Sequence, residues 1–372
     1  MEIFLVGGAV RDRLLGIEPG ERDWVVLGST AEEMLALGFR RLDAEFPVFA
    51  HPESGEEYAL ARREEKAGAG HKGFTVEFDA GVTLEEDLRR RDLRVNAIAE
   101  SSTGDLIDPF GGRADLESRV LRHVSPAFVE DPLRVLRAAR FAARLAGLGF
   151  EISPATRELM KAMSESDDMR FLSGGRIWRE MDRALATDHP ARFFLELMAC
   201  GALPILFPEF AIEHESRESL ATLDTVGQRD PRPELRFAAL INICSGTDSL
   251  ATAQILERLD LRFPLPKKYA ELARIVSITC PAAASDASEM YSALEAVDAF
   301  RRPERFADAL IVCEVLGAGG AADKPMARLQ KAFQVAAAVS GADVARHGAG
   351  GAETGIELKR LRIRAMEKTL TS

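Results

Sequence analysis

The sequence has little of what marks a secreted, metal-stabilised or membrane protein. Its four cysteines, Cys200, Cys244, Cys280 and Cys313, include no close pair, and it has only six histidines. This pattern argues against a disulfide framework or a structural zinc site and favours buried free thiols in a reducing compartment. No apolar run reaches membrane-spanning length, and the first apolar segment is too short for a signal peptide. We therefore expect a cytoplasmic protein that does not contact a membrane.

An excess of positive charge is also lacking. The 372 residues carry 48 Lys and Arg against 59 Asp and Glu, a formal net charge of −11. Taken alone, this balance argues against a nucleic-acid partner, because proteins that bind nucleic acids usually carry a basic surface. The composition, 47% hydrophobic and 29% charged, is that of a globular protein. A chain of this length is expected to form two to four structural units.

The sequence changes in character after Arg119. Before this residue, short apolar runs separated by turn residues predict strands, mixed with a few helical patterns. From Ser125 onward, apolar residues recur at intervals of three and four, which predicts helices. We therefore expect an α+β protein, in which a small mixed-sheet domain of roughly 120 residues is followed by an all-α remainder.

Two glycines, Gly7 and Gly8, follow the first predicted strand and begin the first predicted helix. Glycine lets the backbone approach a ligand closely, and the N-terminus of a helix offers N–H groups to an anion. Arg11 lies in the first turn of the same helix, so the segment is a candidate phosphate-binding turn. On its own, the pattern is equally compatible with a tight turn beside a surface arginine.

A pair of acidic residues follows at a spacing of two. Glu21 and Asp23 would project from one face of a strand, where two carboxylates repel each other unless a cation joins them. Mg²⁺ takes such oxygen ligands and completes its coordination with phosphates. Glu57, in a later strand-like run, is a candidate third acid on this face. An isolated pair of this kind is more often a solvated strand edge, and Glu57 is also compatible with a solvated turn.

Arginine is concentrated first in residues 89–94. Arg91 is the candidate phosphate ligand in this segment, because a guanidinium group bonds two oxygens at once. Asp92 and Asn96 are four apart, on one face of a helix, where they would hold a ribose or orient Arg91. For the first two arginines of the segment, a surface helix with ion pairs four residues apart is an equally good interpretation.

Arginine is concentrated again after Asp131. Aspartate followed by Pro132 is typical of a helix start, with the aspartate as N-cap. The helix that follows carries four arginines on one stripe: Arg134, Arg137, Arg140 and Arg144. Such a stripe repels itself unless negative charge neutralises it. It therefore predicts either a bound anion or packing against acidic side chains from elsewhere in the chain.

Together these segments resemble a known family. LVGGAVRDRLLG, ERDWVV, EEYALAR, RRDLRVNAIA, IDPFGG, LRHVSPAFVEDPLRVLRAARFAARL and GALPILFPEF follow one another as in class II bacterial CCA-adding tRNA nucleotidyltransferases. The resemblance is dense over residues 1–210 and loose beyond them, mainly at TGIELKRLRIRA. It implies an Mg²⁺-dependent enzyme that adds and repairs the 3′-terminal CCA of tRNA. Such an enzyme uses CTP and ATP, needs no nucleic-acid template and releases pyrophosphate.

The resemblance also implies an organisation and a set of roles. It implies a nucleotidyltransferase head of the polymerase-β superfamily (1–125), a helical neck (126–210), a helical body (211–300) and a helical tRNA-binding tail (301–372). The positions that match the catalytic, Mg²⁺-holding pair are Glu21 and Asp23, although many members have Asp at both. The positions that match nucleotide-binding residues are Gly8, Arg11, Arg91, Arg137 and Arg140. The positions that match the base-selecting pair are Asp131 and Arg134. Further candidates are Gly7, Glu57, Asp92 and Asn96.

Two segments qualify this interpretation. Some relatives carry an HD phosphohydrolase domain in the body, but Asn242 and Ile243 stand here where its His-Asp doublet would be. We therefore expect a body that is an HD-like remnant without metal ligands and without phosphatase or phosphodiesterase activity. Residues 61–74 are charged and Gly-rich, and they are a candidate mobile loop for the switch from CTP to ATP.

The expected partners are the 3′ end and acceptor arm of tRNA, CTP and ATP, and we expect a monomer. The net charge is compatible with this, because Lys and Arg cluster in residues 89–94, 119–144 and 359–368. A CC-adding enzyme, an A-adding enzyme and a poly(A) polymerase are the alternatives. A non-catalytic tRNA-binding protein is disfavoured, because Asp23, the two glycines and the arginine stripe are all present.

Overall fold

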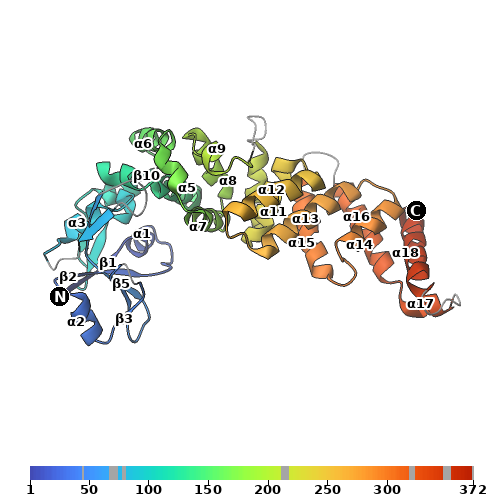
Figure 1. Ribbon diagram of the computed structural model, residues 1–372, viewed down its shortest axis with the longest axis horizontal. Coiled ribbons are helices and arrows are strands. Elements are labelled where there is room, and N and C mark those ends of the chain that lie inside the picture. Colours follow the sequence, from blue (N-terminus) through green and yellow to red (C-terminus); the bar gives the residue numbers. More distant parts are fainter. Residues whose placement is uncertain are drawn as a thin grey trace. The chain divides into compact units, whose positions relative to one another are not determined.

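The computed structural model describes residues 1–43, 46–66, 74–77, 81–210, 218–317, 323–346 and 353–370. The chain divides into two compact units, which we describe separately. Unit 1 comprises Met1–Glu180 and Arg192–Leu206, and unit 2 comprises Met181–Ala191 and Phe207–Ser372. Figure 1 shows the larger strands gathered in the N-terminal, blue-to-teal part of the chain, with helices beyond it. The predicted α+β class is therefore confirmed, whereas the four predicted domain limits stay predictions.

Unit 1 begins with a seven-stranded mixed sheet in the order β3-β4-β5-β2-β1-β8-β9. Its strands are β1 (Glu2–Val6), β2 (Asp23–Leu27), β3 (Arg40–Arg41), β4 (Val48–Ala50), β5 (Glu57–Leu60), β8 (Ala99–Ser101) and β9 (Leu106–Ile107). β1 pairs antiparallel with β2 and β8, whereas β2 pairs parallel with β5. β6 (Arg63–Lys66) and β7 (Phe74–Glu77) form a separate antiparallel pair. β6 lies within the candidate mobile loop 61–74 and β7 begins at its last residue, whereas residues 67–73 lie outside the described residues.

The seven-stranded sheet is covered on both faces. Because side chains alternate along a strand, neighbouring residues of β2 pack on different faces. On one face, Val25 of β2 packs with Val6 of β1 and with Leu88 of α3 (Leu84–Arg89). On the other face, Val26 packs with Met34 of α2 (Ala31–Ala36). Since Asp23 is two residues before Val25, it shares the face that α3 covers and lies where that face ends.

The helices of the first part of the chain are short. They are α1 (Gly8–Leu14), α2 (Ala31–Ala36), α3 (Leu84–Arg89), α4 (Gly112–Glu117), α5 (Leu133–Leu145), α6 (Pro154–Ser164), α7 (Gly174–Leu185), α8 (Pro190–Ala199) and α9 (Leu203–Leu206). The 3₁₀ turns are Arg94–Asn96, Pro126–Glu130, Ala146–Leu148 and Asp167–Phe171. One parallel pair of two-residue strands, β10 (Val120–Leu121) and β11 (Glu151–Ile152), extends β-structure past the point where only helices were predicted. Thr30 and Thr83 begin α2 and α3 with capping boxes.

Unit 2 is helical throughout its described residues. Its helices are α10 (Ala221–Arg229), α11 (Pro233–Ser245), α12 (Ser249–Arg262), α13 (Lys267–Ala282), α14 (Ala287–Ala296), α15 (Pro303–Gly317), α16 (Asp323–Ala337), α17 (Gly341–Arg346) and α18 (Thr354–Leu370). α11 and α15 both pack against α13. The buried Asn242 donates hydrogen bonds to the carbonyl oxygens of Ala238 and Ala273, so it takes part in the packing of α11 on α13. None of the described helices is long and apolar enough to cross a membrane.

The prediction of free thiols is wrong for two of the four cysteines. Cys280 on α13 and Cys313 on α15 form a disulfide, with their Cα atoms 5.3 Å apart. They are 33 residues apart in the sequence, and only the packing of α13 on α15 brings them together. Cys200 and Cys244 are free, and burial raises the pKa of both thiols, that of Cys244 to about 12.

A stability prediction follows from the close packing at Gly112, which begins α4. A Cβ atom at this position would lie 2.8 Å from Cγ1 of Ile98 and closer still to the carbonyl oxygen of Arg94. Because a backbone carbonyl cannot move aside cheaply, we expect Gly112→Ala to lower the free energy of unfolding by about 2 kcal/mol. Chemical denaturation measures this. Gly175→Ala is the control, because a Cβ at Gly175 meets no atom within 4 Å, and an equal loss in both variants would contradict the prediction.

Candidate active site

The predicted acidic residues lie where the first pair of strands ends. Asp23 is paired with Val6 across β1 and β2, and with Glu57 across β2 and β5. Residues paired directly on neighbouring strands project from the same face. Asp23 and Glu57 therefore lie side by side, next to the turn that begins at Gly7, and both are exposed. The structure thus brings Glu57 to the acidic face on which it was a candidate.

The expectation that Glu21 and Asp23 share a strand is wrong. β2 begins at Asp23, opposite Val6, which is the last residue of β1. Beyond Val6 the chain turns into α1, so no partner strand is left for Glu21, which lies exposed in the bend before β2. Within the described part of the chain, no three His, Cys, Asp or Glu side chains are grouped so as to hold a metal ion.

The turn between β1 and α1 at Gly7 and Gly8, called the GG turn below, needs glycine at its first position for two reasons. Gly7 has φ +74°, a left-handed conformation, and its N–H donates to the carbonyl oxygen of Ile98 at 3.2 Å. A Cβ at Gly7 would lie 3.1 Å from Nη1 of Arg91. The missing side chain therefore leaves the space in which the guanidinium group of Arg91 approaches the turn. Gly8 is the first residue of α1.

Arg11 is buried, with 1% of its surface exposed. Its guanidinium group donates to Asp12 at 2.6 and 2.9 Å and to Oδ1 of Asn96 at 2.5 Å, and it lies 5.0 Å from the ring centre of Phe141. Burial lowers the pKa of Arg11, although Asp12 opposes this shift. The side chain therefore ties α1 to the segment that contains Asn96.

Asp92 and Asn96 are joined by a hydrogen bond, but not on the predicted helix: α3 ends at Arg89, Leu93 is extended, and only Arg94–Asn96 form a 3₁₀ turn. Oδ1 of Asp92 accepts from Nδ2 of Asn96 at 3.1 Å and from the backbone N–H of Leu93 at 2.8 Å, while Oδ2 accepts from Nε of Arg137 at 2.7 Å. Burial alone would raise the pKa of Asp92, but the charge of Arg137 and these hydrogen bonds hold it well below its usual range. Asp92 is therefore a buried anion that orients Arg137.

Arg91 is oriented by a different acid from the one expected. Its Nη2 donates to Oδ2 of Asp87 at 3.1 Å, while Arg90 donates to Oδ1 of the same carboxylate at 2.7 and 3.0 Å. Arg89 instead forms an exposed ion pair with Glu85, four residues before it. The surface interpretation is therefore right for Arg89, whereas Arg90 and Arg91 point into a buried acid.

Acidic side chains from distant parts of the chain neutralise much of the arginine stripe on α5. Arg140 donates to Oε2 of Glu180 at 2.6 Å, and Arg144 donates to Oδ2 of Asp12 at 2.6 Å. The partners are 40 and 132 residues away from these arginines. Of the two interpretations of the stripe, packing against acidic neighbours is therefore observed.

The predicted base-selecting pair is held by its surroundings. Arg134 donates through Nη1 to the carbonyl oxygen of Ala127 at 2.6 Å and through Nη2 to that of Arg90 at 2.5 Å. Oδ2 of Asp131 accepts from Nη2 of Arg176 at 2.7 Å. These contacts bring α5, the end of α3 and the start of α7 together around the pair.

The prediction that Asp131 is the N-cap of α5 is wrong. Pro132 occupies the N-cap position, and Asp131 has the extended backbone angles φ −119° and ψ 108°. Its Oδ1 nevertheless accepts from the N–H of Leu133 at 3.1 Å. One oxygen of the carboxylate thus serves the turn and the other serves Arg176.

Three acids at this site were missed from the sequence: Asp12, Asp87 and Glu180. Asp87 had a usable signal, because it lies three and four residues before two arginines, the spacing of neighbours on a helix. Asp12 and Glu180 had none, since their partners are distant in the sequence. Only the packing of α1 and α7 near α5 reveals them.

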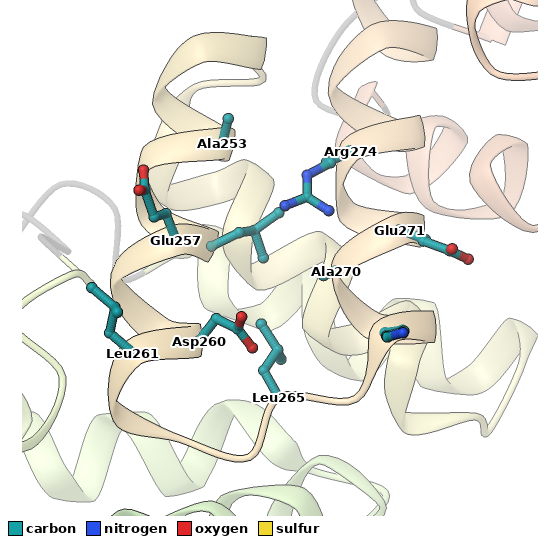
Figure 2. A pocket seen from close by; sticks show the side chains of 10 residues that line it. Ala253, Glu257, Asp260, Leu261, Leu265, Ala270, Glu271 and Arg274 are labelled. Carbon is teal, nitrogen blue, oxygen red and sulfur yellow. The ribbon is translucent and has the colours of Figure 1, made fainter.

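A separate pocket of about 570 Å³ lies between α12 and α13 in unit 2. Its lining residues are Ala253, Leu256, Glu257, Asp260, Leu261, Leu265, Lys267, Ala270, Glu271 and Arg274. Figure 2 shows acidic side chains on both helices and Arg274 on α13. The lining contains three acidic and two basic residues, so its charge does not favour a polyanion. None of the predicted site residues lines it.

Comparisons with known proteins identify the family. Residues 3–122 match the family model "Poly A polymerase head domain", and residues 149–213 match "Probable RNA and SrmB- binding site of polymerase A". A CCA-adding enzyme of Pseudomonas putida is 45% identical to this chain over 374 residues, with 99% of each chain covered. This chain belongs to the family of CCA-adding enzymes. A further relative, the "Multifunctional CCA protein" of Thioalkalivibrio sulfidiphilus, is 43% identical over 99% of this chain and 98% of its own.

Solved structures of CCA-adding enzymes share the fold. The Bacillus stearothermophilus enzyme in complex with CTP has a TM-score of 0.68 and 24% identity, covering 98% of this chain and 88% of that one. The Thermotoga maritima enzyme complexed with tRNA_CCA has a TM-score of 0.68 and 23% identity, covering 100% and 91%. At these identities the likeness concerns the fold alone. The resemblance to CCA-adding enzymes inferred from the motifs is confirmed by the family model and the curated relatives.

Proposed function

We propose that this CCA-adding enzyme completes and repairs the 3′ end of tRNA, using CTP and ATP without a nucleic-acid template. The observation that carries the proposal is the 45% identity, over nearly the whole of both chains, to a CCA-adding enzyme. The arrangement of acids and arginines at the GG turn supports it. In the proposed reaction, the 3′-hydroxyl of tRNA attacks the α-phosphate of the nucleotide, and pyrophosphate leaves.

We assign Mg²⁺ to Glu21 and Asp23, with Glu57 as a further candidate; the described residues do not group all three acids, and the geometric support is for Asp23 with Glu57. The fit rests on the pairing of Asp23 with Glu57 across β2 and β5, which puts two exposed carboxylates side by side. Mg²⁺ prefers carboxylate oxygens as ligands. A bound cation would also relieve the repulsion between the two neighbouring carboxylates. When bound, Mg²⁺ lowers the pKa of the attacking hydroxyl and stabilises negative charge on the leaving group.

We assign the phosphates and the ribose to Gly8, Arg91, Arg137, Arg140 and the Asp92–Asn96 pair. Arg91 reaches the GG turn through the space left by Gly7, which favours contact with a phosphate there. Arg137 is presented by Asp92 and Arg140 by Glu180. Because Arg11 is buried and fully occupied with Asp12 and Asn96, we propose that it acts by holding Asn96 in place.

We assign base selection to Asp131 and Arg134. A carboxylate accepts from an exocyclic amino group, and a guanidinium group donates to ring nitrogens or carbonyl oxygens. Cytosine and adenine both offer an amino group, whereas uracil and guanine present the wrong pattern. A base that leaves buried polar groups unpaired is rejected strongly. Arg176 orients the carboxylate and the two carbonyl oxygens orient the guanidinium group, so the pair is rigid before a base arrives.

We place tRNA along unit 1 and the basic helix α18, and we propose a cytoplasmic monomer. α18 carries Lys359, Arg360, Arg362, Arg364 and Lys368. Arg362 lies 4.2 Å from the ring centre of Phe300, which fixes part of this basic surface. For unit 2 we propose no metal-dependent phosphatase or phosphodiesterase activity, because Asn242 is used in packing and Ile243 has no ligand atom.

The experiment that tests the function is a set of incubations of tRNA ending at the discriminator base with Mg²⁺ and labelled nucleotides. CTP alone should add two residues, ATP alone none, and both together three. Two residues with both nucleotides would indicate a CC-adding enzyme. No addition to this tRNA with either nucleotide, together with addition of one A to tRNA ending in CC, would indicate an A-adding enzyme. Long tracts of A would indicate a poly(A) polymerase, and no pyrophosphate release would indicate a binding protein.

A further inference from the structure

Asp87 is a buried carboxylate to which none of the proposed steps assigns a role. It lies on α3 and has 0% of its surface exposed. Oδ1 accepts two hydrogen bonds from Arg90, and Oδ2 accepts one from Arg91. The backbone N–H of Arg62 also donates to Oδ1 of Asp87, at 3.4 Å. Each oxygen thus holds a different arginine.

The charge of Asp87 is maintained by these two arginines. A buried carboxylate is costly unless it is paired and hydrogen-bonded. Burial would raise its pKa, but the charges of Arg90 and Arg91 outweigh burial and lower the pKa to about 2. The carboxylate is therefore ionised at neutral pH and attracts both guanidinium groups permanently.

The consequence for Arg91 is a fixed direction. Asp87 binds Nη2, while Nη1 lies at the GG turn, 3.1 Å from the position that a Cβ of Gly7 would take. Among the described residues, the buried Nε of Arg91 has no hydrogen-bond partner, and Asp87 is the side chain that anchors the guanidinium group. A free arginine loses much rotamer entropy when it binds a ligand, and an anchored one has already lost it.

We propose that Asp87 is a positioning residue for triphosphate binding, which holds Arg91 in the orientation that meets phosphate at the GG turn. The inference rests on the proposed role of Arg91 in nucleotide binding. It assigns to Asp87 an effect on both nucleotides equally, because a triphosphate is common to CTP and ATP. It assigns no effect on the choice of base, since Arg134 is held by carbonyl oxygens.

The test is Asp87→Asn, which keeps the shape and removes the charge. We expect KM for both CTP and ATP to rise roughly three- to tenfold, with kcat and the ratio of CTP to ATP use unchanged. The inhibition constant of pyrophosphate should rise by the same factor. Glu85→Gln is the matched control, because it breaks an arginine–carboxylate pair on the same helix without touching Arg91, and it should leave KM unchanged.

Arg91→Ala and the double variant separate the outcomes. If Asp87 acts through Arg91, Asp87→Asn has no further effect on KM in an Arg91→Ala background. A rise in KM with Arg91→Ala but not with Asp87→Asn overturns the inference and leaves the proposed function intact. No rise with Arg91→Ala overturns both the inference and the nucleotide-binding role of Arg91. If Asp87→Asn does not fold, Asp87→Ser, which also removes the charge, replaces it, and an unchanged KM in that variant likewise overturns the inference.

Discussion

Asp23→Asn is expected to abolish transfer of both CTP and ATP, with kcat lower by roughly 1,000-fold or more. Asparagine has the shape of aspartate but lacks the charge that holds a divalent cation beside phosphates. Asp23 is the acid at the centre of the proposed metal site, because it is paired with Glu57 on one side and borders the GG turn on the other. Incorporation of labelled CTP and ATP into tRNA lacking CCA measures the loss.

The matched control is Glu2→Gln. Glu2 is also an exposed acid of the same sheet, but it is paired with Leu27 at the opposite end of β1 and β2. It should therefore retain full activity and wild-type stability. Activity of Asp23→Asn within tenfold of the wild type would show that the metal site lies elsewhere.

Asp131→Ala is expected to lower the preference for CTP and ATP over UTP and GTP by roughly 100-fold or more. In the proposed role, the carboxylate accepts from the amino groups of cytosine and adenine, and its loss leaves Arg134 as the remaining donor. The proposed Mg²⁺ site lies on β2 and β5 beside the turn after β1, and Asp131 is not part of it, so incorporation itself should persist. Competition among the four nucleotides for one tRNA measures the change in preference.

The control for Asp131 is Glu158→Ala, on an exposed position of α6. Truncation of Asp131 removes the hydrogen-bond partner of Arg176 and can lower stability. The melting temperature of each variant is therefore measured together with its kinetics. A folded Asp131→Ala variant with wild-type preference would contradict the base-selecting role. Asp131→Asn is a further comparison, since its amide presents a donor where the carboxylate presents only acceptors.

The features that could be predicted from the sequence are local ones. Gly7, Gly8 and Asp23 flank the same end of two neighbouring strands, so their proximity follows from a short antiparallel pairing. The closeness of Asp92 and Asn96 was predicted from a helical spacing of four, but the backbone between them is an extended residue and a 3₁₀ turn. Helices beyond Ser125 follow from the period of the apolar residues, because burial of one face imposes it.

The features that could not be predicted depend on where distant segments meet. Asp12 and Glu180 neutralise arginines of α5 that are 132 and 40 residues away in the sequence. No local sequence pattern predicts such pairs. The bond between Cys280 and Cys313 depends on helix packing in the same way. The alternation of acidic side chains predicts a strand that includes Glu21, but it does not reveal that the partner strand ends opposite Asp23.

The acidic net charge also has a local explanation. Several acids do not lie on the surface, where they would repel nucleic acid. They are buried and bind arginines of the predicted nucleotide pocket. Asp87 and Asp92 are almost fully buried, and each holds at least one arginine of the predicted nucleotide pocket. A negative balance over the chain is therefore compatible with a phosphate-binding site.

The most direct test of the central claim is the mass of tRNA lacking CCA before and after incubation with the enzyme, Mg²⁺, CTP and ATP. The account predicts a gain equal to two cytidylates and one adenylate, and then no further growth. An unchanged mass, or continued addition of adenylate without cytidylate, would contradict it.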